Sequence, residues 1–525
     1  MSASEEAEKY LSRLSALTIE WIKRGEQSDS LVSRWASSSQ LRDNVTLDLS
    51  EEAQSEDALF DNMRSILDNS INPYTGRFLD KLYSAPRPIG LAAENLLSTL
   101  NANGHVMSAS PMLCLAEETC VAGLAKLCGW NAEEADGLTM PGGSSSNTLA
   151  MQTALQNRFP AFRKQGMLGI MKDLMREGTE INACRPLLFT SAQSHYSLDK
   201  AAMGCGLGLE SVVKVPCDAQ GRMDVAALER LIIAAKDGDA APPERRGVPF
   251  FVNATSGSTV LGSFDNLQAI SEVCQRYRLW LHVDGSWGGP VLFSEKWAKL
   301  MSGIDKCDSL AINPHKVLNA PLQCSFAVFK RGSSLEANSL DAGYLFHTDS
   351  QVGIESTSRS RHLARRENPG ALAYGCGRRG DALKLYLLWN RYGRRGLGEH
   401  VDRGFELAQR VADLTSSEKY KHTLESGPRP DPLFLQVCFR PTTSLEEFRR
   451  LRKDEQIEAL SKCTRHVHAT LRQRRRFAVD FAPLPGEIGE FIRLVVHPQT
   501  SFTDLADLVQ DIAIIGAEYF RTTFG

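Results

Sequence analysis

The stretch Leu279-Trp280-Leu281-His282-Val283-Asp284 decides the fold class, because it is an apolar run of strand length that ends in a carboxylate. A second such run, at residues 308–313, leads into Pro314-His315-Lys316, so that Lys316 follows Asp284 by 32 residues. This separation is that of one βαβ unit. The carboxyl ends of parallel strands meet at one edge of a sheet, so we expect Asp284 and Lys316 to lie close together.

Further apolar runs of strand length occur at residues 186–191, 211–216, 249–255 and 324–330. They alternate with segments of helical period such as residues 265–277. This alternation predicts an α/β fold with a mostly parallel, buried central sheet.

Three domains are expected from the pattern along the chain. Residues 1–90 form an N-terminal helical segment, residues 91–400 a large α/β domain and residues 401–525 a smaller C-terminal α+β domain. Within the large domain, residues 332–370 lack a clear period and carry an arginine-rich tract, which indicates a loop.

Composition excludes several classes of partner. The 525 residues hold 60 Lys and Arg against 63 acids, and a net charge of −3 gives no field that would recruit nucleic acid or an anionic membrane. Residues 1–25 mix charged with apolar side chains, so we expect neither a signal peptide nor a membrane span, and a cytoplasmic location. The 12 cysteines are scattered singly, without metal-ligand spacing, and no metal site is expected.

Lys316 and Asp284 together meet a requirement of pyridoxal 5'-phosphate (PLP) chemistry. A lysine that a strand delivers into a cleft loses solvation and can attack an aldehyde. A carboxylate can keep the pyridine nitrogen of the cofactor protonated, so that the ring accepts electrons. Each residue alone has a simpler interpretation, as a surface charge or a helix cap.

Two further segments fit the same chemistry. Pro141-Gly142-Gly143-Ser144-Ser145-Ser146-Asn147 leads into a predicted helix at residues 148–157, and glycines before a helix N-terminus form a phosphate site. His195, in Ser194-His195-Tyr196-Ser197, follows a predicted strand and could stack on the cofactor ring. A flexible turn and a structural histidine are the alternatives.

In combination these motifs resemble the group II PLP-dependent amino-acid decarboxylases, most closely the glutamate and cysteine-sulfinate decarboxylase branch. The resemblance covers about residues 75–525. It includes Asn253-Ala254-Thr255-Ser256-Gly257-Ser258, Leu322-Gln323-Cys324-Ser325, Cys376-Gly377-Arg378-Arg379 and Phe491-Ile492-Arg493-Leu494. It implies the aspartate aminotransferase-like fold (fold type I of PLP-dependent transferases), with PLP bound in the large domain.

The resemblance also implies roles for individual residues. Lys316 forms the internal aldimine, Asp284 pairs with the pyridine nitrogen and His195 stacks on the ring. The other expected cofactor ligands are Thr255, near the phenolic oxygen, and Ser145, Ser146, Asn313 and His315, at the phosphate. Arg493 matches the arginine that binds the substrate α-carboxylate. An L-amino acid would displace Lys316 and lose carbon dioxide through a quinonoid intermediate, in a homodimer whose active sites lie at the subunit interface.

Several positions depart from the family pattern. Val352 stands where a loop tyrosine protonates the substrate carbon after decarboxylation; Tyr374 could substitute for it. Without an acid, the outcome could be oxidative, giving an aldehyde, or form a carbon–carbon bond. At residues 101–108, Asn103 is kept but His105 replaces the usual residue. A protonatable His105 could still favour an acidic substrate such as glutamate, aspartate or cysteine sulfinate. The alternative is that His105 only lines the wall of the site.

Two other functions fit the sequence less well. A non-catalytic relative that binds a metabolite is disfavoured because Lys316, Asp284 and Arg493 are all present. A nucleotide-dependent dehydrogenase is disfavoured because no Gly-x-Gly-x-x-Gly fingerprint follows a predicted strand.

Overall fold

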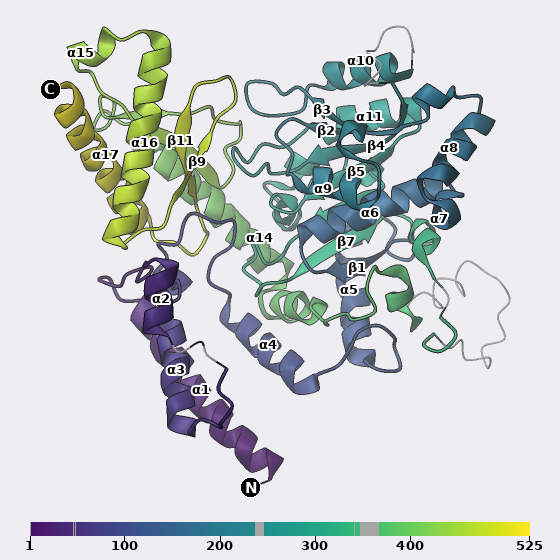
Figure 1. Ribbon diagram of the computed structural model, residues 1–525, viewed down its shortest axis with the longest axis horizontal. Helices are drawn as coiled ribbons and strands as arrows, with labels where there is room; N and C mark the ends of the chain where they lie inside the picture. The colour runs from purple at the N-terminus through teal and green to yellow at the C-terminus, as the bar shows by residue number, and fades with distance from the viewer. Residues whose placement is uncertain (1, 46, 48, 237–245, 341, 347–366) are drawn as a thin grey trace. The chain divides into compact units, whose positions relative to one another are not determined.

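The computed structural model describes residues 2–525 except 46, 48, 237–245, 341 and 347–366 (Figure 1). The chain forms two compact units. The large unit comprises Pro86–Arg403 and Pro430–Phe434; the small unit comprises Met1–Ala85, Gly404–Arg429 and Leu435–Gly525. The N-terminal segment thus clusters with the C-terminal part of the chain. The three-domain division stays a prediction about which parts fold independently.

The large unit is built on a seven-stranded sheet in the order β1-β7-β6-β5-β4-β2-β3. Its strands are β1 Asp136–Met140, β2 Pro186–Ser191, β3 Val212–Val215, β4 Val248–Thr255, β5 Trp280–Gly285, β6 Ser309–Ile312 and β7 Ser325–Phe329. Strands β3, β2, β4, β5 and β6 are parallel, whereas β7 runs antiparallel to β6 and β1. The expected α/β class with a mostly parallel sheet is confirmed, and β1 is a strand that the sequence pattern did not reveal.

Strand register places the predicted site at the carboxyl edge of the sheet. Thr255 of β4 lies opposite Asp284 of β5, and Asp284 lies opposite Ala311 of β6. All but the first residue of β5 are buried, as expected for a central strand covered on both faces. The polar side chains that end these strands therefore gather at one place.

Most helices of the large unit pack against this sheet or against helices that cover it (Figure 1). They are α4 Pro88–Leu100, α5 Pro111–Leu127, α6 Gly143–Arg158, α7 Phe162–Gln165, α8 Met167–Arg176, α9 Ser197–Gly204, α10 Val225–Lys236, α11 Leu267–Tyr277 and α12 Gly332–Leu335. Helices α6 and α9 contact each other, and α6 crosses β4 to β7. Helices α10 and α11 lie together over β3, β4 and β5.

Helix α6 begins earlier than its sequence predicts. Its first residue is Gly143 rather than Thr148, because Gly142 adopts a φ of 113° and lets the chain turn directly from β1 into the helix. Ser144 to Asn147 therefore occupy the first turns of α6 rather than a flexible loop.

The core of the large unit lies between the sheet and helices α6, α8 and α9. Phe159, Leu188 and Phe251 are completely buried there, with Phe250 beside them. Burying such a side chain contributes about 1.5–3 kcal/mol. This packing fixes β2, β4 and α6, the elements that carry much of the site.

The small unit contains a four-stranded antiparallel sheet in the order β10-β11-β9-β8. These strands are β8 Leu424–Ser426, β9 Gln436–Pro441, β10 Asp480–Pro483 and β11 Glu490–Val495. Its helices are α1 Ala3–Gly25, α2 Ser38–Asn44, α3 Glu56–Asp68, α15 Glu446–Arg449, α16 Lys453–Arg474 and α17 Phe502–Phe524. Helix α14 (Ala382–Thr415) is kinked at Gly393 and contributes residues to both units. Among the described residues, no helix has the length and apolarity needed to cross a membrane.

Candidate active site

Lys316 and Asp284 interact electrostatically, as the sequence predicts. Lys316 lies beyond the end of β6 and is partly exposed. Burial lowers the pKa of Lys316, and the charge of Asp284 opposes this effect. A lysine with a lowered pKa spends more time as the free amine, the form that attacks an aldehyde.

The carboxylate of Asp284 is buried and held by two hydrogen bonds. Its Oδ1 accepts from the Ser286 amide at 3.1 Å, and its Oδ2 accepts from the Asn147 side-chain nitrogen at 2.9 Å. Burial alone would raise the pKa of Asp284, but these bonds and the charge of Lys316 outweigh burial and lower it. Asp284 therefore stays ionised although it is only 5% exposed.

His195 and Thr255 lie at the same edge of the sheet. The Ser197 amide donates to Nδ1 of His195 at 3.2 Å. Burial lowers the pKa of His195; the charge of Asp284 opposes this shift, and the charge of Lys316 adds to it. Thr255 ends β4, and its buried Oγ1 has no hydrogen-bond partner among the described residues.

The N-terminus of α6 approaches the same place through its glycines. A Cβ atom on Gly143 would lie 2.4 Å from Oγ of Ser286 and 2.8 Å from Nδ2 of Asn313. Only glycine fits between residues that flank Asp284 and Lys316 in this way. The first turn of α6 therefore lies close to Ser286 and Asn313, and its role as the phosphate site stays a prediction.

The predicted phosphate ligands are connected to one another. Ser325 Oγ donates to Asn313 Oδ1 at 2.6 Å and lies 2.9 Å from Ser146 Oγ. Nδ1 of His315 lies 2.7 Å from the Cys324 carbonyl oxygen and 3.1 Å from the Cys324 amide nitrogen. Burial, with a contribution from the charge of Lys316, lowers the pKa of His315 to about 4. These side chains are oriented by the protein itself.

The arrangement fits the cofactor that the resemblance implies. It offers an amine beside a carboxylate, a buried hydroxyl of Thr255 that has no partner among the described residues, and a glycine-lined helix N-terminus. These are the groups that an aldehyde, a pyridine nitrogen, a phenolic oxygen and a phosphate would require.

The predicted substrate residues Asn103 and His105 lie on a segment bound to residues 367–379. Oδ1 of Asn103 accepts from the Arg378 amide at 2.9 Å, and the His105 carbonyl accepts from the Gly370 amide at 2.8 Å. Nδ1 of His105 also donates to the Asn103 carbonyl at 3.1 Å. The substrate segment therefore depends on the chain that follows residue 366.

Two other predicted positions lie elsewhere. Arg493 lies on β11 in the small unit, where its guanidinium donates to the Asp80 carbonyl and approaches Asp480. Val352 lies outside the described residues. The roles expected for these positions stay predictions.

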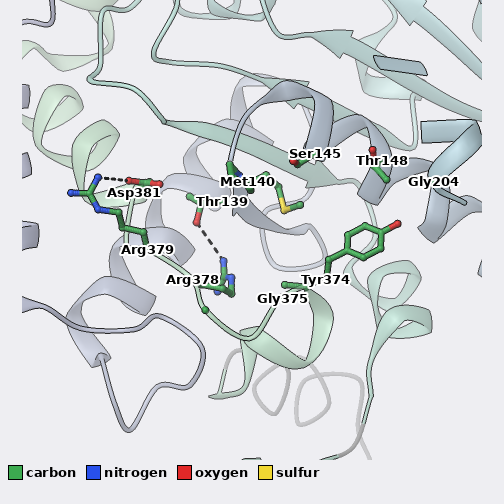
Figure 2. A pocket seen from close by; sticks show the side chains of 13 residues that line it. Thr139, Met140, Ser145, Thr148, Gly204, Tyr374, Gly375, Arg378, Arg379 and Asp381 are labelled. Atoms are coloured by element: carbon green, nitrogen blue, oxygen red, sulfur yellow. Dashed lines mark hydrogen bonds and ion pairs between the residues drawn. The ribbon is translucent and has the colours of Figure 1, made fainter. Parts of the chain in front are cut away.

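A cavity of about 530 Å³ opens beside Ser145 and is lined also by Met140, Thr148, Tyr374 and Arg378. Figure 2 shows the Tyr374 ring near Thr148 and Gly204, with Arg378 close to Thr139. Burial raises the pKa of the Tyr374 phenol, whose oxygen lies 3.9 Å from the Cys205 sulfur. Lys316 and Asp284 are not among the lining residues, so this cavity adjoins the predicted phosphate end of the site.

Sequence reasoning missed two residues that contact the site. Asn147 lies in the predicted phosphate loop, yet its side chain binds Asp284. His282 has no predicted role of its own, yet it binds Asn147. Residues i and i+2 of a strand point to the same face, which could have placed His282 beside Asp284.

Comparisons with known proteins agree with this geometry. The model of the pyridoxal-dependent decarboxylase conserved domain matches residues 39–441. The chain is 34% identical to the L-aspartate decarboxylase dtxS4 of Metarhizium robertsii, over 89% of this chain and 84% of that protein. It is 33% identical to the cysteine sulfinic acid decarboxylase of Mus musculus, over 95% and 94%. The crystal structure of mouse CSAD superposes with a TM-score of 0.84 at 31% identity, covering 98% and 99%. The chain therefore belongs to the pyridoxal-dependent decarboxylase family, and its cofactor is PLP.

Proposed function

We propose that this PLP-dependent amino-acid decarboxylase acts on a small acidic L-amino acid, such as aspartate, cysteine sulfinate or glutamate. The observation that carries the assignment of the catalytic site is the lysine–carboxylate pair of Lys316 and Asp284 at the edge of the sheet. The acidic substrate is supported by two relatives, whose names state L-aspartate and cysteine sulfinic acid as substrates.

We assign the chemistry at the cofactor to four side chains. PLP, when bound, supplies a conjugated ring that accepts the electron pair of the breaking Cα–carboxylate bond. Nζ of Lys316 would hold the cofactor through its aldehyde, and the substrate amine would take its place. The ionised Asp284 would keep a proton on the ring nitrogen, and Thr255 would donate its hydroxyl to the phenolic oxygen. His195 would cover one face of the ring and exclude water there.

The phosphate is bound by the N-terminus of α6. Its helix dipole and amides favour an anion, and Ser145, Ser146 and Asn313 add side-chain groups. His315 is neutral without a ligand because burial lowers its pKa, but a dianion beside the ring would favour its protonated form. These contacts orient the cofactor rather than react with it.

The substrate is oriented by groups of opposite charge. We assign Arg493 to the α-carboxylate, because a guanidinium can donate two parallel hydrogen bonds to a carboxylate. Asn103 and His105 are assigned to the distal acid, where an amide and an imidazole both donate. A carboxylate or sulfinate side chain would satisfy them, and an apolar side chain would leave them without a partner.

Simple decarboxylation requires a proton for the substrate carbon, and we assign this role to Tyr374. The tyrosine lines the cavity that also contains Ser145, and burial keeps its phenol protonated. The phenolic O–H of Tyr374 would supply the proton that replaces the lost carboxylate on Cα, which gives the amine. If no acid served, dioxygen could take two electrons and become hydrogen peroxide, and water would then replace the nitrogen on that carbon, giving an aldehyde and ammonia.

The Tyr374→Phe variant tests this assignment. It should bind PLP normally while releasing less amine per carbon dioxide and consuming oxygen, measured with an electrode and a peroxide assay. An unchanged amine yield without oxygen uptake would show that Tyr374 is not the acid. Peroxide and aldehyde from the unmodified enzyme would instead favour the oxidative outcome.

We also propose a homodimer with active sites at the subunit interface. Several large apolar side chains of α4 and α5 are exposed in the single chain: Leu91, Leu96, Leu100, Met112 and Leu115. A second copy would bury such a surface. Light scattering after gel filtration should give twice 57.9 kDa, and a monomer would contradict the proposal.

All 12 cysteines are free thiols, eleven of them with a pKa that burial raises, Cys128 and Cys324 among them. This supports a reducing compartment, and we propose the cytoplasm. Fractionation that finds the protein in an oxidising compartment would exclude this location.

A panel of amino acids tests the substrate class. Purified protein with PLP should release carbon dioxide from aspartate, cysteine sulfinate or glutamate, with at least tenfold lower kcat/KM for leucine or tryptophan. Equal or better rates with apolar amino acids would overturn the acidic substrate. No carbon dioxide from any amino acid would favour a metabolite-binding relative.

A further inference from the structure

A chain of buried hydrogen bonds approaches Asp284 from the side of β6; we name it the relay. Nε1 of Trp280 donates to Oγ of Ser309 at 2.9 Å, and this hydroxyl lies 2.8 Å from Nδ1 of His282. Nε2 of His282 lies 3.0 Å from Oδ1 of Asn147, whose Nδ2 donates to Asp284 at 2.9 Å. His282, Asn147 and Ser309 are at most 1% exposed.

The ends of the relay determine where its protons lie. An ionised carboxylate only accepts, so Asn147 must present its NH2 group to Asp284 and its oxygen to His282. His282 must then carry its proton on Nε2, which leaves Nδ1 as an acceptor for the Ser309 hydroxyl. The indole of Trp280 only donates, and it occupies a lone pair of Ser309. For a neutral His282, one arrangement of protons satisfies every bond.

In this arrangement His282 is neutral. Burial lowers the pKa of His282 to about 4, although Asp284 opposes the shift. The ring is held in place by Phe251, whose centroid lies 5.8 Å away at an angle of 30°. The negative charge of Asp284 is therefore not cancelled by a neighbouring imidazolium.

Asn147 also connects two parts of the site. It follows Ser146 on α6, whose N-terminus faces the proposed phosphate position, while its side chain binds the carboxylate on β5. Its Nδ2 also donates to Oγ of Ser197 on α9 at 2.9 Å. The position of α6 and the orientation of Asp284 are thus fixed by the same side chain.

We propose that His282 and Asn147 are positioning residues for PLP: His282 orients the Asn147 amide, and Asn147 orients the Asp284 carboxylate toward the ring nitrogen. The proposal rests on the assignment of Asp284 to that nitrogen. Neither residue touches the reacting atoms, and both act through the carboxylate. Loss of the relay should leave Asp284 charged but free to turn.

Substitutions of His282 separate orientation from packing. His282→Phe keeps a ring but leaves Oδ1 of Asn147 buried without a donor, an effect large enough for about a tenfold change. We expect PLP affinity, measured by equilibrium dialysis, and kcat at saturating PLP each to fall about tenfold, with KM within about threefold. His282→Gln should restore both, because its amide nitrogen is as far from Cβ as Nε2 and also donates.

Asn147→Asp provides a second variant of nearly the same size. It places a carboxylate against Asp284, so the two cannot both stay ionised without repulsion. We expect weaker PLP binding and a changed visible spectrum of the bound cofactor. Thr153→Val is the matched control: it removes another buried hydrogen bond of α6, from Asn338 at 2.7 Å, and should change thermal stability without changing the spectrum.

The outcomes distinguish failure of the relay from failure of the assignment of Asp284 to the ring nitrogen. If Asp284→Ala leaves PLP affinity and spectrum unchanged, the assignment of Asp284 itself fails. If Asp284→Ala abolishes them but His282→Phe and Asn147→Asp bind PLP like the unmodified protein, only the relay fails. Equal losses in His282→Gln and His282→Phe would also overturn it, because a positioning role requires rescue by the donor.

Discussion

The segment that contains Asn103 and His105 is held by a buried ion pair between Glu117 of α5 and Arg378. Replacing Glu117 by glutamine should break this pair and strongly lower the stability of the protein. One oxygen of Glu117 accepts from the Thr139 amide at 2.6 Å, from the Thr139 hydroxyl at 2.5 Å and from the Arg378 guanidinium. The side chains of Arg378 and Glu117 are only 7% and 9% exposed. Glutamine keeps an acceptor for Thr139 but leaves the guanidinium buried without its counter-charge. Breaking such a pair costs about 3–5 kcal/mol.

The energy of the Glu117–Arg378 pair can be measured with a double-mutant cycle, in which the denaturation of the PLP-free protein is followed. Glu117→Gln and Arg378→Met should each lower stability by about 3–5 kcal/mol. The double variant should lose less than the sum, because no unpaired charge remains buried. Costs that add within about 0.5 kcal/mol would refute the reasoning. Arg378→Met should also raise KM, because Arg378 holds the Gly104 carbonyl at 2.8 Å beside Asn103.

Two further predictions concern other parts of the enzyme. Burial raises the pKa of Asp265 to about 6, so the folded protein keeps a proton that the unfolded chain releases near pH 4. Asp265 thus makes stability fall as pH rises from about 4 to 6, by up to about 3 kcal/mol, and Asp265→Asn should flatten this part of a urea-denaturation profile. Arg493→Lys should raise KM for the amino acid about tenfold or more without changing PLP affinity, because an ammonium cannot donate in the bidentate geometry; an unchanged KM would exclude the α-carboxylate role.

Much of the fold is predictable because a parallel sheet covered on both faces demands continuous apolar runs. Strands β2, β4, β5, β6 and β7 are such runs, and the sequence places each within two residues of its observed bounds. Strand β1 is not predictable in this way, because its five residues include Asp136, Gly137 and Thr139 and its burial depends on pairing with β7. Strands β8 and β10 are short and partly exposed, so their sequences carry little periodic signal.

The candidate site was predictable where its chemistry requires a residue type at a strand end. Lys316, Asp284, His195 and Thr255 follow this rule, and the structure brings them to one edge of the sheet. The direction of a side chain is different, because it depends on which partners surround it. Asn147 in a Gly-Ser loop suggests a phosphate ligand, but the early start of α6 turns its amide to Asp284.

The central claim is a covalent bond between the cofactor aldehyde and the amine of Lys316. It is tested most directly by reducing the PLP-bound protein with borohydride, digesting it and locating the modified lysine by mass spectrometry. We predict loss of the visible absorbance band and a phosphopyridoxyl group on Lys316 alone. A label on another lysine, or no label in protein that decarboxylates its substrate, would contradict the account.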